Sequence, residues 1–198
     1  ALHNTMPLDK IRQRGIVLCN ARGVYSIPIA EWVVLKILEM YKNTRFFHDA
    51  QRSAQWIKNR EMLELNGKTA GIIGTGSIGC EIAKRLKAFG CKVIGLNLLG
   101  GCNEFFDSTE ELGALDRFLA KCDIVILALP LTPQTRNLIN RKNLCCMKNN
   151  AVLVNVSRGS IVNEEDLLQH LDRGYLKGAA LDVFENEPHI LPDLLQLD

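Results

Sequence analysis

The sequence has no large excess of either charge, no long apolar run and no cysteine pattern typical of a metal site. Its 198 residues include 24 Lys and Arg against 22 Asp and Glu, which gives a formal net charge of +2. This balance offers no electrostatic basis for binding nucleic acid or for a polybasic membrane anchor. No apolar stretch approaches the roughly 20 residues of a transmembrane helix. We therefore expect neither nucleic acid nor a membrane among its partners.

The spacing of the cysteines predicts neither a metal site nor a disulfide framework. The seven cysteines form no CxxC pair and no Cys/His spacing that suits zinc, so we expect no metal site. An odd number of cysteines without a disulfide framework is typical of reduced thiols packed as small apolar residues, and it indicates the cytoplasm. A redox role for the neighbouring Cys145 and Cys146 stays open.

The start of the chain, its composition and its length give three further indications of the class of protein. The chain begins ALHNTMPLDKIRQRG, without an initiator Met or the charged-then-apolar layout of a secretory signal, so we expect that Ala1 is not a natural N-terminus. With 47% apolar residues, 15 Gly, 6 Pro and no internal repeat, the composition excludes collagen-like and disordered proteins. A length of 198 residues suits one domain, or one domain with part of another.

The N-terminal part of the chain predicts one long helix. Ser26 is expected to cap it, with Pro28 in its first turn, and apolar residues follow at helical spacing as far as Tyr41. A helix this apolar is expected to be buried between larger elements. Residues 15–20, before it, are expected to be the end of a strand. Trp56, after it, is the expected anchor of a polar stretch.

From residue 66 onward, strands and helices are expected to alternate. This alternation predicts an α/β fold, a Rossmann-type doubly wound parallel sheet with helices on both faces. The expected strands cover residues 68–73, 92–96, 123–129, 151–156 and 178–183. The expected helices cover residues 77–89 and 109–121, followed by a third that Asn163 caps.

A glycine-rich motif, Gly74-Thr-Gly76-Ser-Ile-Gly79, lies between a predicted strand and a predicted amphipathic helix. In that context GxGxxG predicts a dinucleotide site. Gly74 permits the tight turn, Gly76 lets a pyrophosphate approach because it has no Cβ, and Gly79 lets the helix pack closely on the strand. The helix N-terminus offers N–H groups and partial positive charge to the phosphates.

The choice between NAD and NADP depends on the end of the next strand. An acidic residue about 20 residues beyond the glycines normally binds the adenosine ribose diol, and this chain has Asn97 there. An asparagine can hydrogen-bond a 2′-hydroxyl and does not repel a 2′-phosphate. No Arg or Lys follows directly to hold such a phosphate. We expect NAD as the cofactor, and NADP stays open as the alternative.

Three later segments carry a family resemblance. They are LALPLTPQTRNLIN (127–140), NVSRGSIVNEEDL (155–167) and GAALDVFENEP (178–188). Together with GTGSIG they resemble the D-isomer-specific 2-hydroxyacid dehydrogenases, from about Asn4 to the last residue. The resemblance implies an oxidoreductase that transfers a hydride between a nicotinamide cofactor and C2 of a D-2-hydroxy acid or 2-oxo acid.

The resemblance implies two catalytic residues. The family's catalytic Arg falls on Arg158, whose planar guanidinium can bind a substrate carboxylate bidentately and polarise the adjacent carbonyl. The family's catalytic Glu falls on Glu187, where it would partner a histidine and favour the protonated imidazole. Glu185 is the nearby competitor for that role.

The resemblance also implies a set of cofactor contacts. Asp182 matches the residue that meets the nicotinamide carboxamide, and Arg158 is counted among the residues at the cofactor. Further matches fall on the pyrophosphate turn, on the loop along the riboses and on the approach to the catalytic Arg: Ser77, Ile78, Leu129, Pro130, Thr135, Val156 and Ser157. Simple packing at the strand ends is the alternative role for these residues.

The family's catalytic histidine is implied downstream of Glu187, and the sequence contains no match to it. Of the four histidines, His189 is expected to be a loop residue and His3 lies at the start of the chain. His48 and His170 are expected on the surface of helices.

The resemblance further predicts how the chain divides. Residues 1–22 are expected to be a remnant of the substrate domain and its hinge, and residues 23–198 the NAD-binding domain with its C-terminal closure missing. We expect such a fragment to bind NAD(H) weakly and to show no turnover by itself.

The expected partners are a small 2-oxo or 2-hydroxy acid and a second copy of the chain. In the family the helix that corresponds to residues 28–41 packs across a two-fold interface; wholly intramolecular packing of this helix is the alternative. A different class of function also stays open, because some relatives are corepressors that bind NAD(H) as a conformational signal on the same fold.

Overall fold

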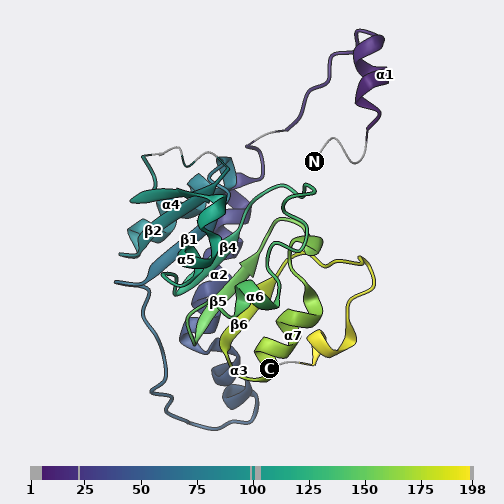
Figure 1. Cartoon of the computed structure of the whole chain (residues 1–198). Helices are drawn as coiled ribbons and strands as arrows, with labels where there is room; N and C mark the ends of the chain where they lie inside the picture. Colours follow the sequence, from purple (N-terminus) through teal and green to yellow (C-terminus); the bar gives the residue numbers. More distant parts are fainter. Residues whose placement is uncertain (1–5, 22, 99, 101–103, 197–198) are drawn as a thin grey trace.

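The computed structural model describes residues 6–21, 23–98, 100 and 104–196 (Figure 1). Its centre is a six-stranded parallel sheet with the strand order β3-β2-β1-β4-β5-β6. This is the strand order of doubly wound dinucleotide-binding sheets, so the prediction of a Rossmann-type fold is confirmed. The strands are β1 (Thr69–Ile73), β2 (Lys92–Asn97), β3 (Ser108–Glu111), β4 (Ile124–Leu127), β5 (Ala151–Asn155) and β6 (Leu176–Leu181).

Helices cover both faces of the sheet, as predicted. On one face lie α2 (Ser26–Lys42) and α4 (Ser77–Ala88). On the other lie α5 (Leu115–Leu119), α6 (Arg141–Leu144) and α7 (Glu164–Asp172). Because both faces are covered, every residue of β4 and β5 is buried, which explains why these two strands are continuous apolar runs.

Local sequence signals determine where α7 begins and where α4 ends. In α7, the side chain of Asn163 accepts a hydrogen bond from Asp166 N at 2.9 Å, so the predicted cap is confirmed. The helix α4 buries Ile82, Ala83 and Leu86 against the sheet. It ends before Gly90, whose φ of +76° suits a chain reversal.

The predicted helix over residues 109–121 is wrong in its first part. Residues Ser108–Glu111 form the edge strand β3, and Leu112–Ala114 form a 3₁₀ turn before the short α5. The segment Ser-Thr-Glu-Glu pairs with β2 through its backbone and has only one neighbouring strand. An edge strand of this kind needs no apolar run, so hydrophobic periodicity does not reveal it.

The N-terminal predictions are also partly wrong. Residues 15–20 form no strand, and Val17 is 85% exposed. The N-cap of α2 is Tyr25 rather than Ser26, whose buried hydroxyl has no hydrogen-bond partner among the described residues. Trp56 is 95% exposed and anchors nothing within the described chain. Two helices that the sequence did not predict, α1 (Leu8–Gln13) and α3 (Thr44–Arg52), lie before and after α2 in the chain.

The long helix α2 is buried on one face only. Ala30, Val33, Ile37 and Tyr41 pack on the sheet, whereas Leu35 on the outer face is 51% exposed. Residues 6–21, which include α1, contribute no buried side chain, and α1 lies away from the sheet in Figure 1. None of the helices in the described ranges has the length and apolar character needed to cross a membrane.

The cysteines are less uniform than the sequence predicts. Cys91 and Cys122 are packed in the core as small apolar residues, but Cys19 and Cys145 are exposed. Burial raises the pKa of the Cys91 thiol to about 11 and that of Cys122 to about 12. Burial thus makes two of the thiols inert and leaves others open to solvent.

Candidate functional site

The candidate site lies along one edge of the sheet. All strands are parallel, so the segments that follow them leave from the same edge, and in doubly wound sheets ligands bind at this carboxyl edge. The order of strands reverses between β1 and β4, which are paired up to Ile73 and Leu127. The same edge therefore carries most of the residues that the sequence singles out: Gly74, Asn97, Leu129, Val156, Arg158 and Asp182.

The glycine turn between β1 and α4 is closely packed. Gly74 has a φ of +106°, and a Cβ at this residue would lie 2.3 Å from Ala128 O, at the end of β4. A Cβ on Gly79 would lie 2.1 Å from Gly74 O. The absence of side chains at Gly74 and Gly79 thus lets the turn touch β4 and lets α4 pack on the turn.

Gly76 is different, because a Cβ there would meet nothing within 4 Å. It faces open space at the start of α4. The first bond of the helix is donated by Cys80 N to Gly76 O at 2.9 Å, so the N–H groups of Ser77, Ile78 and Gly79 precede any intrahelical bond. Open space beside these donors and the positive end of the helix fits a dinucleotide pyrophosphate.

The end of β2 is linked to the glycine turn. The side-chain amide of Asn97 donates a hydrogen bond to Thr75 Oγ1 at 2.9 Å. Thr75 also packs over β2, since a Cβ on Gly95 would lie 2.7 Å from its methyl group. Thr75 was not among the expected site residues, although it stands between Gly74 and Gly76 and contacts Asn97, the residue expected to bind the ribose.

The loop after β4 contains three of the residues implied by the resemblance. Leu129 is half-buried and Pro130 is exposed at the strand end. Thr135 is 5% exposed, donates a hydrogen bond to Pro130 O at 2.8 Å and accepts one from Thr132 N at 2.7 Å. The described contacts of Thr135 thus hold the loop closed upon itself.

The turn after β5 presents Arg158 to solvent. Asn155, which is 1% exposed, accepts hydrogen bonds from Ser157 N at 3.0 Å and Ser157 Oγ at 2.7 Å. Its amide nitrogen donates to Arg158 O at 3.1 Å. Val156 and Ser157 are buried, whereas Arg158 is exposed. The Arg158 guanidinium donates a hydrogen bond to Ser157 O at 2.6 Å. Asn155, which sequence analysis missed, therefore fixes the shape of this turn.

The segment that carries Glu187 packs directly on the Arg158 turn. A Cβ on Gly159 would lie 1.8 Å from the carbonyl carbon of Phe184, so the two backbones touch. One carboxylate oxygen of Glu187 accepts a hydrogen bond from Phe184 N at 2.9 Å. Asp182, at the start of this segment, donates its N–H to Asn155 O at 3.0 Å. The structure thus brings together the two segments that carry the predicted catalytic residues.

A buried carboxylate that sequence analysis missed joins the same two segments. Glu164, in the first turn of α7, is 8% exposed and accepts a hydrogen bond from Glu185 N at 2.6 Å. Glu165, its neighbour, points to solvent. The run of acids after Asn163 was the available signal, but it does not say which carboxylate turns inward. Glu164 thus positions the segment that carries Glu187, because its carboxylate binds the backbone N–H of Glu185.

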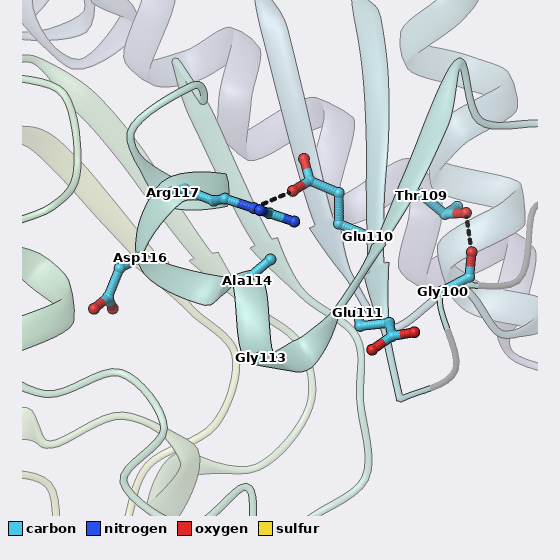
Figure 2. Close-up of a pocket in the computed structure, with 8 residues that line it drawn as sticks. All are labelled: Gly100, Thr109, Glu110, Glu111, Gly113, Ala114, Asp116 and Arg117. Atoms are coloured by element: carbon cyan, nitrogen blue, oxygen red, sulfur yellow. Dashed lines mark hydrogen bonds and ion pairs between the residues drawn. The ribbon is translucent and has the colours of Figure 1, made fainter.

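A pocket of about 630 Å³ lies farther out along the sheet, between β3 and α5 (Figure 2). Its carboxylates include Glu110, which binds Arg117 and Lys121; the hydrogen bond from Lys121 is the main cause that lowers the pKa of Glu110. The strand β3 is four positions from β5, or roughly 19 Å at 4.8 Å per strand. This pocket is therefore separate from the turn after β5 that carries Arg158.

Comparison with known proteins identifies the family. Residues 34–198 match the family model described as D-isomer specific 2-hydroxyacid dehydrogenase, NAD binding domain. The chain belongs to this family. The resemblance seen in the sequence motifs is thereby confirmed.

Three relatives illustrate the similarity. The chain is 35% identical to D-3-phosphoglycerate dehydrogenase of Methanocaldococcus jannaschii, over 98% of this chain and 38% of that protein. It is 39% identical to glyoxylate reductase of Thermofilum pendens, over 91% of this chain and 55% of that protein. A crystal structure of D-lactate dehydrogenase from Aquifex aeolicus with NAD and lactic acid superposes with a TM-score of 0.84 at 28% identity, covering 97% of this chain and 62% of that one. The chain thus spans less than two thirds of the length of each of these proteins.

The geometry of the glycine turn separates folding from cofactor binding. We expect Gly76→Ala to leave the unfolding temperature unchanged, because a Cβ there meets nothing within 4 Å, and to weaken NADH binding by about tenfold or more by obstructing the pyrophosphate. The matched variant Gly79→Ala is expected to lower the stability by about 1–3 kcal/mol, since its Cβ would strike Gly74 O. NADH fluorescence titration and thermal unfolding measure the two effects. Wild-type NADH affinity in Gly76→Ala would contradict a pyrophosphate at this turn.

Proposed function

We propose that this chain forms the cofactor-binding part of an oxidoreductase that transfers a hydride between a nicotinamide cofactor and C2 of a D-2-hydroxy acid or 2-oxo acid. The observation that carries the proposal is the contact between the Arg158 turn and the Glu187 segment at the carboxyl edge of the sheet. The names of the relatives, two dehydrogenases and a glyoxylate reductase, support the substrate class. Nothing in the structure or these relatives supports the corepressor-like alternative.

We assign the chemistry to residues as follows. The exposed Arg158 guanidinium binds the substrate carboxylate and polarises the neighbouring C2 carbonyl. The Glu187 carboxylate holds the imidazole of an acid–base histidine in its protonated form, ready for carbonyl reduction. Asp182, next to Asn155 at the end of β6, holds the nicotinamide carboxamide. The bound nicotinamide supplies or accepts the hydride.

We propose that the other matched positions surround the cofactor. Ser77 and Ile78 meet the pyrophosphate, Leu129 and Pro130 lie along the riboses, and Val156 and Ser157 shape the approach to Arg158. Thr135 contributes indirectly, by holding the loop of Pro130 in place.

We also propose a division of the chain. Residues 1–22 belong to the substrate domain and its hinge, since residues 6–21 bury no side chain against the sheet. Residues 23–198 form the NAD-binding domain. A cytoplasmic location is likewise proposed, because the described cysteines are thiols rather than disulfides.

We propose NAD rather than NADP as the cofactor. Asn97 at the end of β2 is paired in register with Glu111 of β3, which is exposed. Glu110 precedes it, and its charge is already matched by Arg117 and Lys121. The Glu111 carboxylate would therefore repel a 2′-phosphate near Asn97, whereas it would not repel an uncharged ribose diol.

We propose that two copies of the chain associate through the outer face of α2 and the segment that follows α3. Ile27 and Leu35 on α2 are each 51% exposed, and Trp56 is 95% exposed. Large apolar side chains that remain exposed in a single copy are candidates for burial in a symmetric interface. Burial of this face explains why α2 is more apolar than its packing on the sheet requires.

The role of Arg158 is testable in the enzyme that contains this chain with its substrate domain. We expect Arg158→Ala to lower kcat/KM for glyoxylate reduction by roughly 10²-fold, the effect of losing a charge-assisted bidentate contact. Arg158→Lys should restore only part of the activity, because a lysine is not bidentate. Arg173→Ala, an exposed arginine after α7, is the control. Unchanged kcat/KM in Arg158→Ala would remove Arg158 from the reaction.

The cofactor preference is testable at Asn97. We expect Asn97→Asp to weaken NADPH binding by about tenfold or more through charge repulsion and to leave NADH binding the same or tighter. The dissociation constants of both reduced cofactors, measured by fluorescence titration, give the ratio. Wild-type protein that already binds NADPH more tightly than NADH would contradict the proposed preference.

The association of two copies is testable on the outer face of α2. We expect Leu35→Arg to convert a dimer into a folded monomer, since each copy would have to bury an unpaired charge in the interface. Light scattering after size exclusion gives the mass, and circular dichroism checks the fold. Leu98→Arg, which changes an exposed leucine at the end of β2, is the control. A dimer that survives Leu35→Arg would place the interface elsewhere.

A further inference from the structure

A cysteine and a histidine outside the candidate site are in contact between α6 and α7. Cys145 follows the last residue of α6 and is exposed, and its Sγ lies 3.5 Å from Nε2 of His170. His170 is only 5% exposed, so its expected place on the helix surface is wrong. Its ring packs edge-on against Tyr175, with the ring centroids 5.7 Å apart. A solvent-exposed thiol thus rests on a fixed, buried imidazole.

The hydrogen bonds of His170 determine which of its ring nitrogens carries the proton when the imidazole is neutral. Nδ1 lies 2.9 Å from the backbone oxygen of Asp166, one turn earlier in α7. A carbonyl oxygen only accepts hydrogen bonds, so the neutral imidazole carries its proton on Nδ1. Nε2 then offers a lone pair, and the Cys145 thiol donates to it. A nucleophile, a base and a group that orients the base are the three parts of an activated nucleophile.

The two helices that carry this pair are joined by further bonds. The carboxylate of Asp166 accepts a hydrogen bond from Arg141 N at 2.9 Å, at the start of α6. Just before the two helices, Ile139 and Val162 form a parallel bridge. These contacts keep α6 and α7 in register, and therefore hold the thiol against the imidazole.

Four other described cysteines differ from Cys145 in their surroundings. Cys146 is half-buried, its thiol donates to Lys142 O at 3.5 Å, and burial is the main cause that raises its pKa. Cys91 and Cys122 are buried. Cys19 is exposed, with no imidazole contact within the described ranges. The chain therefore contains its own comparison thiols.

We propose that Cys145 is a site of thiol–disulfide exchange with low-molecular-weight disulfides of the glutathione class, with His170 as its base. The Cys145 sulfur attacks one sulfur of the disulfide, and its proton passes to Nε2 of His170. A new S–S bond forms as the old one breaks; Cys145 is oxidised to a mixed disulfide, and the other half of the reagent is reduced and leaves as a thiol with the proton. No other oxidant is required.

This site is separate from the cofactor edge. The helix α7 runs from the carboxyl end of β5 back to the amino end of β6, and His170 lies in its last turn. Cys145 likewise follows the C-terminal end of α6, before β5 begins. The pair thus lies toward the amino edge of the sheet, and exchange at Cys145 requires neither the glycine turn nor Arg158.

The experiment compares cysteines within one molecule. The chain is treated with glutathione disulfide at pH 7, quenched at intervals, and the modified fraction of each cysteine is measured by mass spectrometry. A free thiol with a pKa near 8.5 is only about 3% thiolate at pH 7, so assistance from the imidazole is expected to make Cys145 react about tenfold faster than Cys19. Cys145→Ser should abolish the fast adduct, and Cys146→Ser, its matched control, should not.

The role of His170 is tested with His170→Asn, whose amide can still donate to Asp166 O but offers no base to the thiol. We expect the Cys145 rate to fall to that of Cys19, while the Cys19 rate is unchanged. Modification of Cys91 or Cys122 would reveal unfolding of the variant, and the wild-type ratio of Cys145 to Cys19 then decides the question. Equal rates at these two cysteines in the wild type, or an undiminished Cys145 rate in a folded His170→Asn variant, would overturn the proposal.

Discussion

The close contact between the glycine turn and the end of β4 is the constraint on which the candidate site depends. Gly74 lies so near Ala128 that any side chain there would overlap the backbone of the neighbouring strand. This contact leaves no room for a side chain between Gly74 and Ala128, whereas the space beside Gly76 is open. The start of α4 is therefore directed at the opening, where its N–H groups can meet a phosphate.

A second set of polar contacts organises the other half of the edge. Asn155 is buried at the end of β5, and it would be costly there without its bonds to Ser157 and to the carbonyl of Arg158. Glu164 is buried in the same way and is satisfied by the backbone of Glu185. Because buried polar groups tolerate few alternative geometries, the positions of the two segments are linked, and the exposed Arg158 is carried by a rigid support.

The parts of the fold that could be predicted are those in which local chemistry and burial agree. The runs of β4 and β5 are apolar because both faces are covered, and Asn163 is a cap in sequence and in structure. The edge strand β3 was missed because backbone pairing with β2 needs no apolar pattern. Glu164 and His170 were missed for a related reason: a polar side chain turns inward only where a distant segment offers a partner, and sequence spacing does not show that partner.

The parallel topology also places the two proposed sites at opposite edges of the sheet. Loops that follow the strands gather at the carboxyl edge, where helix N-termini favour anions. The C-terminal ends of α6 and α7 return to the opposite edge, where Cys145 meets His170. An adduct at Cys145 would leave the glycine turn accessible. The first residue of α7, Glu164, accepts a hydrogen bond from Glu185 N and so holds the segment that carries Glu187. The helix α7 thus contacts the Glu187 segment at one end and carries His170, which contacts Cys145, near the other.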